Sequence, residues 1–124
     1  MTKLYLSIAS LSGVLAVILG AFGAHGLRDK LTPALMSAYQ TGVQYQFYHT
    51  LALLAVAILL QRFSHSIWLQ ASGGLFVVGM LMFSGSLYCL ALGGPSWLGP
   101  ITPIGGLCFM LAWLSLFVAV WRIP

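Results

Sequence analysis

The stretch LYLSIASLSGVLAVILGAFGAHGL, residues 4–27, runs for 24 residues without a charged side chain and lies between Lys3 and Arg28. An α-helix rises about 1.5 Å per residue, so about 20 apolar residues cross a hydrocarbon layer that is about 30 Å thick. This stretch is therefore long enough to cross a membrane once as a helix.

The remaining charges divide the rest of the chain in the same way. Lys30 and Arg62 are separated by 31 uncharged residues, enough for one span, and Arg62 and Arg122 by 59, enough for two with a turn at Gly93-Gly94-Pro95-Ser96. The sequence thus predicts an all-α integral membrane protein, an antiparallel bundle of four transmembrane helices with short loops. We expect one domain, residues 1–124, with spans at about 4–27, 33–61, 67–92 and 103–121.

Composition supports a lipid bilayer as the surroundings of this chain. Of 124 residues, 60% are hydrophobic and only 5% are charged, whereas a soluble domain has about 25% charged residues. The net charge of +4 does not indicate nucleic-acid binding, because the five cations are scattered and form no basic stripe. They mark the ends of the predicted spans instead.

The cations also give an expected orientation. An even number of spans puts both termini on one side, with Lys3, Arg62 and Arg122, and leaves Arg28 and Lys30 on the other. Cytoplasmic loops carry the excess of Lys and Arg. We therefore expect both termini to be cytoplasmic.

Several residues predict where helices begin and end. Thr32-Pro33 and Thr102-Pro103 each place a capping Thr before a Pro in the first helical turn. The third helix has Ser64 or Ser66 as its cap. At the end of the first helix, His25 is placed to cap the last carbonyls, with Gly26 in the left-handed conformation.

Small residues recur on two of the predicted spans at helical spacing. Such stripes let helices approach closely in lipid, where apolar helices gain little simply by meeting. They predict close packing within the bundle or, alternatively, a face for a homo-oligomer. The stripes comprise Ser12, Ala16, Gly20 and Ala24 in the first span and Cys108, Ala112, Ser115 and Ala119 in the last.

The outer half of the second span is polar nearly all round, and amides or an imidazole facing lipid would be costly. His49 is the one intramembrane group that would titrate near neutral pH. Two interpretations remain open: hydrogen bonds across the bundle that fix helix register, or a polar pocket for a headgroup, a quinone or a small polar solute, open toward the outer leaflet. The candidate binding residues are Gln44, Tyr45, Tyr48, His49 and His25.

The residues needed for most enzyme chemistry are missing. Asp29 is the only carboxylate side chain, so paired acids are absent, and neither a phosphate-binding loop nor a Cys-x-x-Cys motif occurs. We expect no catalytic residue, no metal site and no cofactor. A haem between His25 and His49 is disfavoured, because His49 lies about eight residues, roughly 12 Å, deeper than the outer boundary near His25.

Four strings in combination resemble a known family. The residues GAFGAHGL (20–27), TGVQYQFYHTLALL (41–54), FSGSLYCLAL (83–92) and ITPIGG (101–106) are similar to those of the YgdD/YwdK-like family, a domain of unknown function, family four-twenty-three. The resemblance covers nearly the whole chain. It implies a four-helix protein of a bacterial inner membrane and implies no particular activity.

Three hypotheses about function follow. The first is a non-enzymatic membrane protein that binds a lipid-like or small polar ligand, or a partner membrane protein. The second is a passive or proton-linked carrier of a small solute around His49. The third is an accessory subunit of a respiratory or transport complex.

Overall fold

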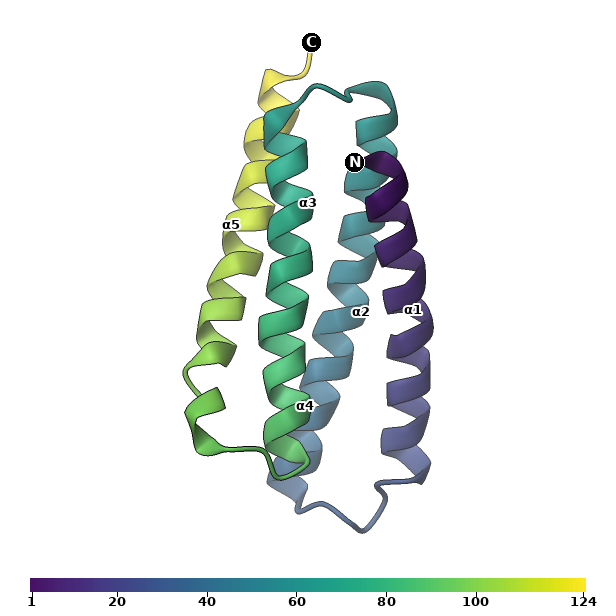
Figure 1. The fold of residues 1–124 in the computed structure, drawn as a ribbon, viewed down its shortest axis with the longest axis vertical. Coiled ribbons are helices and arrows are strands. Elements are labelled where there is room, and N and C mark those ends of the chain that lie inside the picture. Colours follow the sequence, from purple (N-terminus) through teal and green to yellow (C-terminus); the bar gives the residue numbers. More distant parts are fainter.

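The computed structural model describes residues 1–124 and contains helices but no strands. Both termini lie at one end of an elongated bundle (Figure 1). The helices are α1 (Thr2–His25), α2 (Pro33–Arg62), α3 (Ile67–Gly79), the π-helical turn η1 (Met80–Ser84), α4 (Gly85–Ala91), the short 3-10 helix η2 (Ser96–Leu98) and α5 (Ile101–Arg122). α3, η1 and α4 form one continuous helical rod. Counted in this way, the bundle has four helical rods, and each is long and apolar enough to cross a membrane. The predicted fold class is confirmed.

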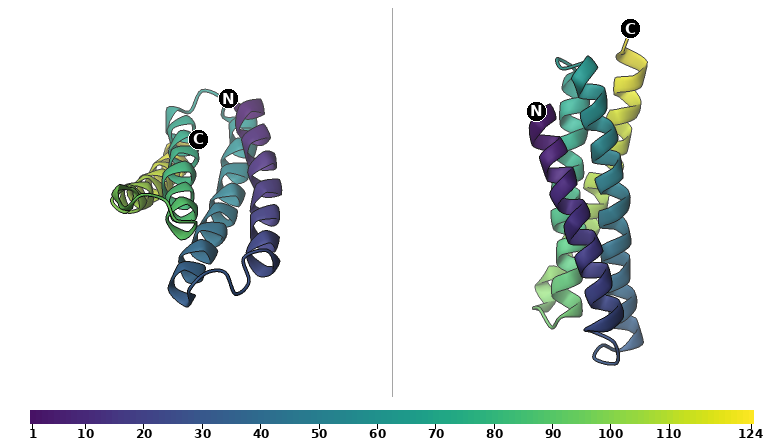
Figure 2. Two further views of the ribbon diagram at one scale, coloured as in Figure 1. Left: turned by 60° about the horizontal axis from the view of Figure 1, so that its bottom comes forward. Right: turned by 90° about the vertical axis from the view of Figure 1, so that its right-hand side faces the viewer.

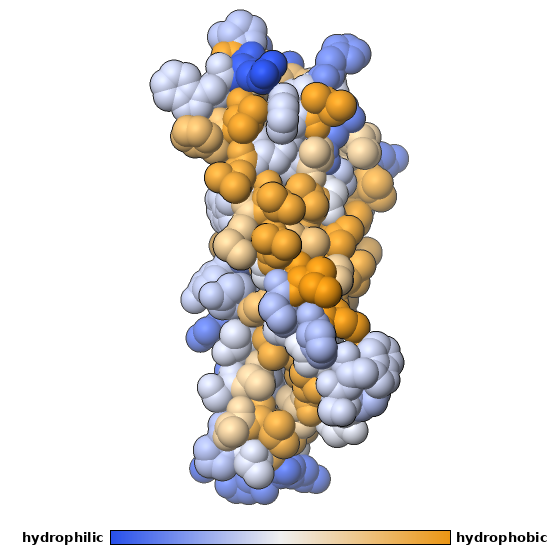
Figure 3. Space-filling model, turned by 90° about the vertical axis from the view of Figure 1, so that its left-hand side faces the viewer, coloured by the Kyte–Doolittle hydropathy of each residue, from blue (hydrophilic) through white to orange (hydrophobic).

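The rods pair as two hairpins. α1 packs chiefly against α2, and α5 packs chiefly against α3, as both figures of the ribbon show (Figures 1 and 2). α2 also contacts α3, η1 and α4, so it joins the two hairpins. On the α5 side of the molecule, apolar side chains run along much of the length, with more hydrophilic ones among them in the lower half, and the most hydrophilic residues lie mainly at the two ends (Figure 3). This distribution matches a rod set across a hydrocarbon layer.

Helix starts follow two of the predicted caps. The Thr32 hydroxyl accepts a hydrogen bond from Leu35 N at 3.2 Å, with Pro33 in the first turn of α2. Of the two candidates for α3, Ser66 is the cap, since its hydroxyl accepts from Leu69 N at 3.3 Å.

Two predicted terminal residues behave differently from the expectation. Thr102 is not a cap, because α5 already begins at Ile101 and the Thr102 hydroxyl hydrogen-bonds Ser86 of α4. Gly26 is right-handed, with φ −71°, so the predicted left-handed conformation is wrong. The residue with positive φ in this loop is Asp29, at 62°.

The C-terminus of α1 is capped by backbone N–H groups and not by the His25 side chain. The N–H groups of Gly26 and Leu27 both donate to the carbonyl of Phe22. A Cβ at Gly26 would lie 2.5 Å from the Phe22 ring, so a larger residue here would displace that half-exposed side chain.

Both small-residue stripes contribute to packing inside the bundle. On α1, Ser12 hydrogen-bonds α2, Ala16 is buried, and a Cβ on Gly20 would meet Val43 of α2 at 3.4 Å; only Ala24 is exposed. On α5, the last three stripe residues are buried, and two of them pair with α3 through hydrogen bonds. The expected close approach of helices is thus present within one chain.

At Gly105, α5 comes close to the backbone of η1. A Cβ at this position would lie 2.4 Å from Phe83 N, a backbone atom that cannot rotate away. At the next residue, Gly106, a Cβ would meet only the Phe83 ring, at an ordinary 3.7 Å. The two glycines therefore form a matched pair.

We expect Gly105→Ala to lower stability by about 1–3 kcal/mol, the usual cost of overpacking a well-filled contact. Gly106→Ala should leave stability unchanged or raise it, since Ala favours a helix over Gly by about 1 kcal/mol. Thermal unfolding of both variants in detergent measures the difference. Equal melting temperatures for the two variants would contradict the close approach of α5 and η1.

Candidate functional site

The predicted site residues on α2 all lie within residues 44–49, but their side chains point to different faces of the helix. Gln44 and Tyr48 are exposed, Tyr45 is 38% exposed, and His49 is buried. The Tyr45 ring lies near both Tyr48 and His49, with centroids 6.0 and 5.8 Å away. The structure thus brings three of these rings near one another without enclosing them in a common pocket.

Both ring nitrogens of His49 are engaged in hydrogen bonds. Nδ1 lies 2.7 Å from the Tyr45 carbonyl oxygen, and the Trp113 indole Nε1 donates to Nε2 at 3.1 Å. A carbonyl only accepts and an indole N–H only donates, so the geometry assigns the neutral tautomer with its proton on Nδ1. The ring also stacks on Phe109 of α5, with 3.6 Å between centroids. His49 therefore links α2 to α5 through one hydrogen bond and one ring stack.

The two histidines of the candidate set lie at different depths. Thr50, the neighbour of His49, packs at the level of Gly13 on α1, where a Cβ would lie 3.9 Å from its methyl group. His25 is exposed and lies twelve residues further along α1, about 18 Å at the helical rise. The structure does not bring His25 and His49 together.

A buried polar network, centred on Gln46, joins three rods. The Gln46 amide nitrogen donates to the Ser12 carbonyl at 3.1 Å and lies 3.2 Å from its hydroxyl, while Tyr88 O–H donates to the Gln46 amide oxygen at 2.6 Å. The Ser12 and Thr50 hydroxyls are 2.7 Å apart. Met80 sulfur lies beside this pair, 3.8 Å from Ser12 and 3.5 Å from Thr50.

Gln46, Ser12 and Tyr88 are not among the site residues predicted from the sequence, although the sequence contains a signal for Gln46. The buried side chains on the apolar half of α2, Leu53, Val56 and Leu60, recur at steps of three and four. Continuing those steps backward reaches Gln46. The inward face of α2 could thus have been extended from its apolar half into its polar half.

The network forms the floor of a groove of about 390 Å³ between α1 and the η1–α4 part of the third rod. On α1 it extends from Ile8 to Leu19, about 16 Å of helix in the middle of the span. Its walls are mostly aliphatic, and the lining residues with polar side chains are Ser12, Gln46, Ser84 and Tyr88. None of the five residues selected from the sequence lines this groove.

These features define a class: a four-span integral membrane protein with a laterally placed apolar groove above a buried polar network. Comparison with known proteins identifies the family. The family model described as "Protein of unknown function (DUF423)" matches residues 19–106, and the chain belongs to that family. The resemblance of its four sequence strings is thereby confirmed.

Named relatives are similar to nearly the full length of this chain. The chain is 42% identical over 117 residues to UPF0382 membrane protein YwdK of Bacillus subtilis (94% of this chain, 95% of the relative). It is 41% identical over 122 residues to UPF0382 inner membrane protein YgdD of Escherichia coli K12 (98% and 92%). A UPF0382 membrane protein of Staphylococcus epidermidis is 44% identical over 117 residues (94% of each chain). No solved structure matches.

Gln46→Leu should lower stability by about 1–3 kcal/mol, because it leaves the Tyr88 hydroxyl and the Ser12 groups without their amide partner in a buried place. Gln44→Leu, two residues away and exposed, is the control and should change stability little. Chemical or thermal unfolding in detergent compares them. A larger loss in Gln44→Leu than in Gln46→Leu would refute the network.

Proposed function

We propose that this protein binds a lipid-like molecule, an acyl or similar chain with one polar group, in the groove between α1 and η1–α4. The observation that carries the proposal is the groove itself, an aliphatic channel about 16 Å long with a polar floor at its centre. Its volume of about 390 Å³ lies in the range of ordinary small-ligand sites, about 300–1,000 Å³.

The position of the groove favours a ligand that arrives from the membrane. α1 packs chiefly on α2 and makes only sparse contact with the third rod, so the groove runs along the side of the bundle at hydrocarbon depth. Hydrocarbon chains are the most abundant species at that depth. The wall residues Leu11, Leu15 and Leu81 are each more than half exposed and suit an acyl chain.

The floor supplies recognition for one polar group. The hydroxyls of Ser12 and Tyr88, both partly exposed, already form hydrogen bonds within the protein, yet each hydroxyl oxygen retains capacity to accept from a ligand O–H or N–H, whereas Ser84 is fully buried. A ligand whose acyl chain carries a hydroxyl or an amide, either at its end or midway, would fit this arrangement better than a bare alkane.

The same floor supports binding without catalysis. The groove lining contains no His, Asp, Glu, Lys or Cys that would activate a serine hydroxyl or transfer a proton. His49 lies outside the groove with both nitrogens engaged, which favours a packing role over a gate for a proton-linked carrier. We therefore propose a non-enzymatic binding protein of a bacterial inner membrane.

The orientation proposed is the one with both termini in the cytoplasm. In a variant with Cys89 and Cys108 both replaced by Ser, a cysteine at position 29 should react with a membrane-impermeant maleimide in intact spheroplasts. A cysteine at position 64 should react only after the membrane is permeabilised. The reverse pattern would place the termini outside.

Filling the groove should abolish ligand binding. A Cβ at Gly85 meets nothing within 4 Å, so Gly85→Phe projects a ring into the groove without a backbone clash. With diazirine-bearing palmitic acid as the probe, we expect photolabelling of peptides 8–19 and 77–88 that excess palmitic acid competes away. Gly85→Phe should remove this saturable labelling.

The control for this experiment is Val78→Phe, an exposed residue of the same rod that does not line the groove, and it should retain the labelling. Labelling that excess palmitic acid does not compete, or that survives in Gly85→Phe, would indicate ordinary boundary lipid and defeat the proposal. Purification at a fixed ratio with a larger complex would favour the accessory-subunit hypothesis instead.

A further inference from the structure

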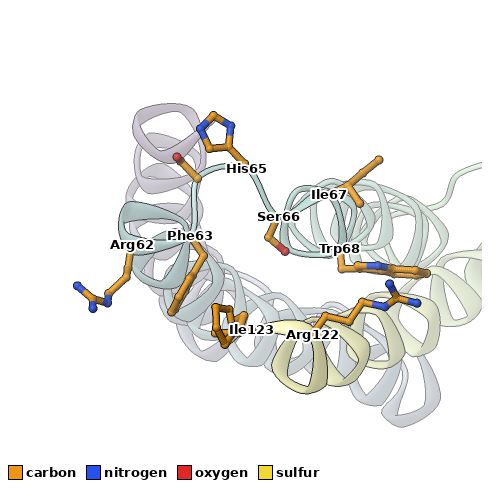
Figure 4. A pocket seen from close by; sticks show the side chains of 10 residues that line it. Arg62, Phe63, His65, Ser66, Ile67, Trp68, Arg122 and Ile123 are labelled. Atoms are coloured by element: carbon orange, nitrogen blue, oxygen red, sulfur yellow. The ribbon is translucent and has the colours of Figure 1, made fainter.

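A second hollow lies at the end of the bundle that holds both termini, far from the groove. It measures about 420 Å³ and is formed by the end of α2, the loop to α3, the first turn of α3 and the end of α5 (Figure 4). Arg62, His65, Arg122 and the C-terminal residue Pro124 line it, and no Asp or Glu does.

One of the two arginines is held in place by an aromatic ring. The Arg122 guanidinium carbon lies 5.7 Å from the centre of the Trp68 ring, a cation–π contact between α5 and the first turn of α3. Arg62 lies on the other side of the hollow and points outward (Figure 4). The hollow is therefore flanked by a positive charge on each side.

No acidic side chain of the protein is available to neutralise these charges. The only one, Asp29, lies in the loop between α1 and α2, at the opposite end of the bundle. The N-terminus of α3 at Ile67 also faces this region, and a helix N-terminus attracts anions through its free N–H groups and dipole. The charged side chains at this end are therefore all cationic, and the C-terminal carboxylate of Pro124 is the one negative group beside the hollow. The net positive charge favours an external anion.

The floor of the hollow is apolar, and this selects among anions. Phe63 and Ile123 point toward each other between the two arginines (Figure 4). Both are partly buried and pack against the main hydrophobic core. A free phosphate ion would gain nothing from these two side chains, whereas a phospholipid brings an anionic phosphate joined directly to apolar chains. The hollow lies at the ends of the spans, the level of lipid headgroups.

We propose that this hollow binds the headgroup of an anionic phospholipid. Arg122, held by Trp68, receives the phosphate next to the first turn of α3, and the start of the acyl chains lies against Phe63 and Ile123. Arg62 attracts the headgroup from the other rim. The site is separate from the groove, and neither proposal depends on the other.

Native mass spectrometry of the full-length protein in detergent tests the site, with phosphatidylglycerol and phosphatidylcholine as probes. We expect phosphatidylglycerol to bind more tightly than phosphatidylcholine. Each arginine near the surface contributes about a five-fold factor in affinity for anionic lipid. Arg122→Gln should therefore weaken phosphatidylglycerol binding about five-fold, and the Arg62→Gln, Arg122→Gln double variant about 25-fold.

Arg28→Gln, which removes a cation from the opposite end, is the matched control and should leave phosphatidylglycerol affinity unchanged. Arg122→Lys keeps the charge and should bind more tightly than Arg122→Gln, even if both variants lose some stability. Equal affinity for the two lipids, or an equal loss in Arg28→Gln, would overturn the proposal. Thermal stabilisation by millimolar inorganic phosphate equal to that by phosphatidylglycerol would indicate a free-phosphate site and would also overturn it.

Discussion

The structure depends on the absence of water from the layer that it crosses. In hydrocarbon, every polar group must find its partner inside the protein. The helices satisfy their own backbones, and no buried side-chain nitrogen or oxygen lacks a hydrogen-bond partner. Three serines illustrate the solution: Ser72, Ser84 and Ser115 each donate to a backbone carbonyl of a neighbouring rod at 2.7–2.8 Å. Because lipid provides no hydrophobic drive between helices, such bonds and close contacts set the register.

α2 concentrates this polar chemistry and divides it between two faces. Toward α1 and α4 it presents Gln46 and Thr50, which hydrogen-bond other side chains. Toward α5 it presents His49, which stacks on Phe109 and accepts from Trp113. The first face adjoins the groove, and the second is filled by rings. This difference explains why a ligand site is proposed on the α1 side and a packing role on the α5 side.

Charge spacing was sufficient to predict four rods, because a span tolerates almost no charge and its length is fixed by the bilayer. Local capping chemistry predicted Thr32 correctly but not Thr102, whose hydroxyl is used by Ser86 of another helix. Tertiary contacts of this kind are not encoded by neighbours in the sequence. Gln46 is a different case, because the steps of three and four between the buried residues of α2 do lead to it. The π-helical turn at 80–84 has no local sequence signal that we recognise.

The candidate residues were chosen by polarity, and polarity alone does not determine direction. Gln44 and Gln46 are chemically identical and two residues apart, yet helical geometry turns one outward and the other inward. The intramembrane position of His49 drew attention to it, but its surroundings are complete without a ligand.

The division into two hairpins has a consequence for biosynthesis. Ribosomal synthesis delivers α1 and α2 to the membrane first, and this pair already contains the Ser12 partner for Gln46. Within the first hairpin, His49 Nδ1 has the Tyr45 carbonyl as its partner, but Nε2 has none, since its indole donor, Trp113, belongs to α5. The Nε2 atom of His49 therefore stays without its hydrogen-bond donor until α5 has been made and packs against α2.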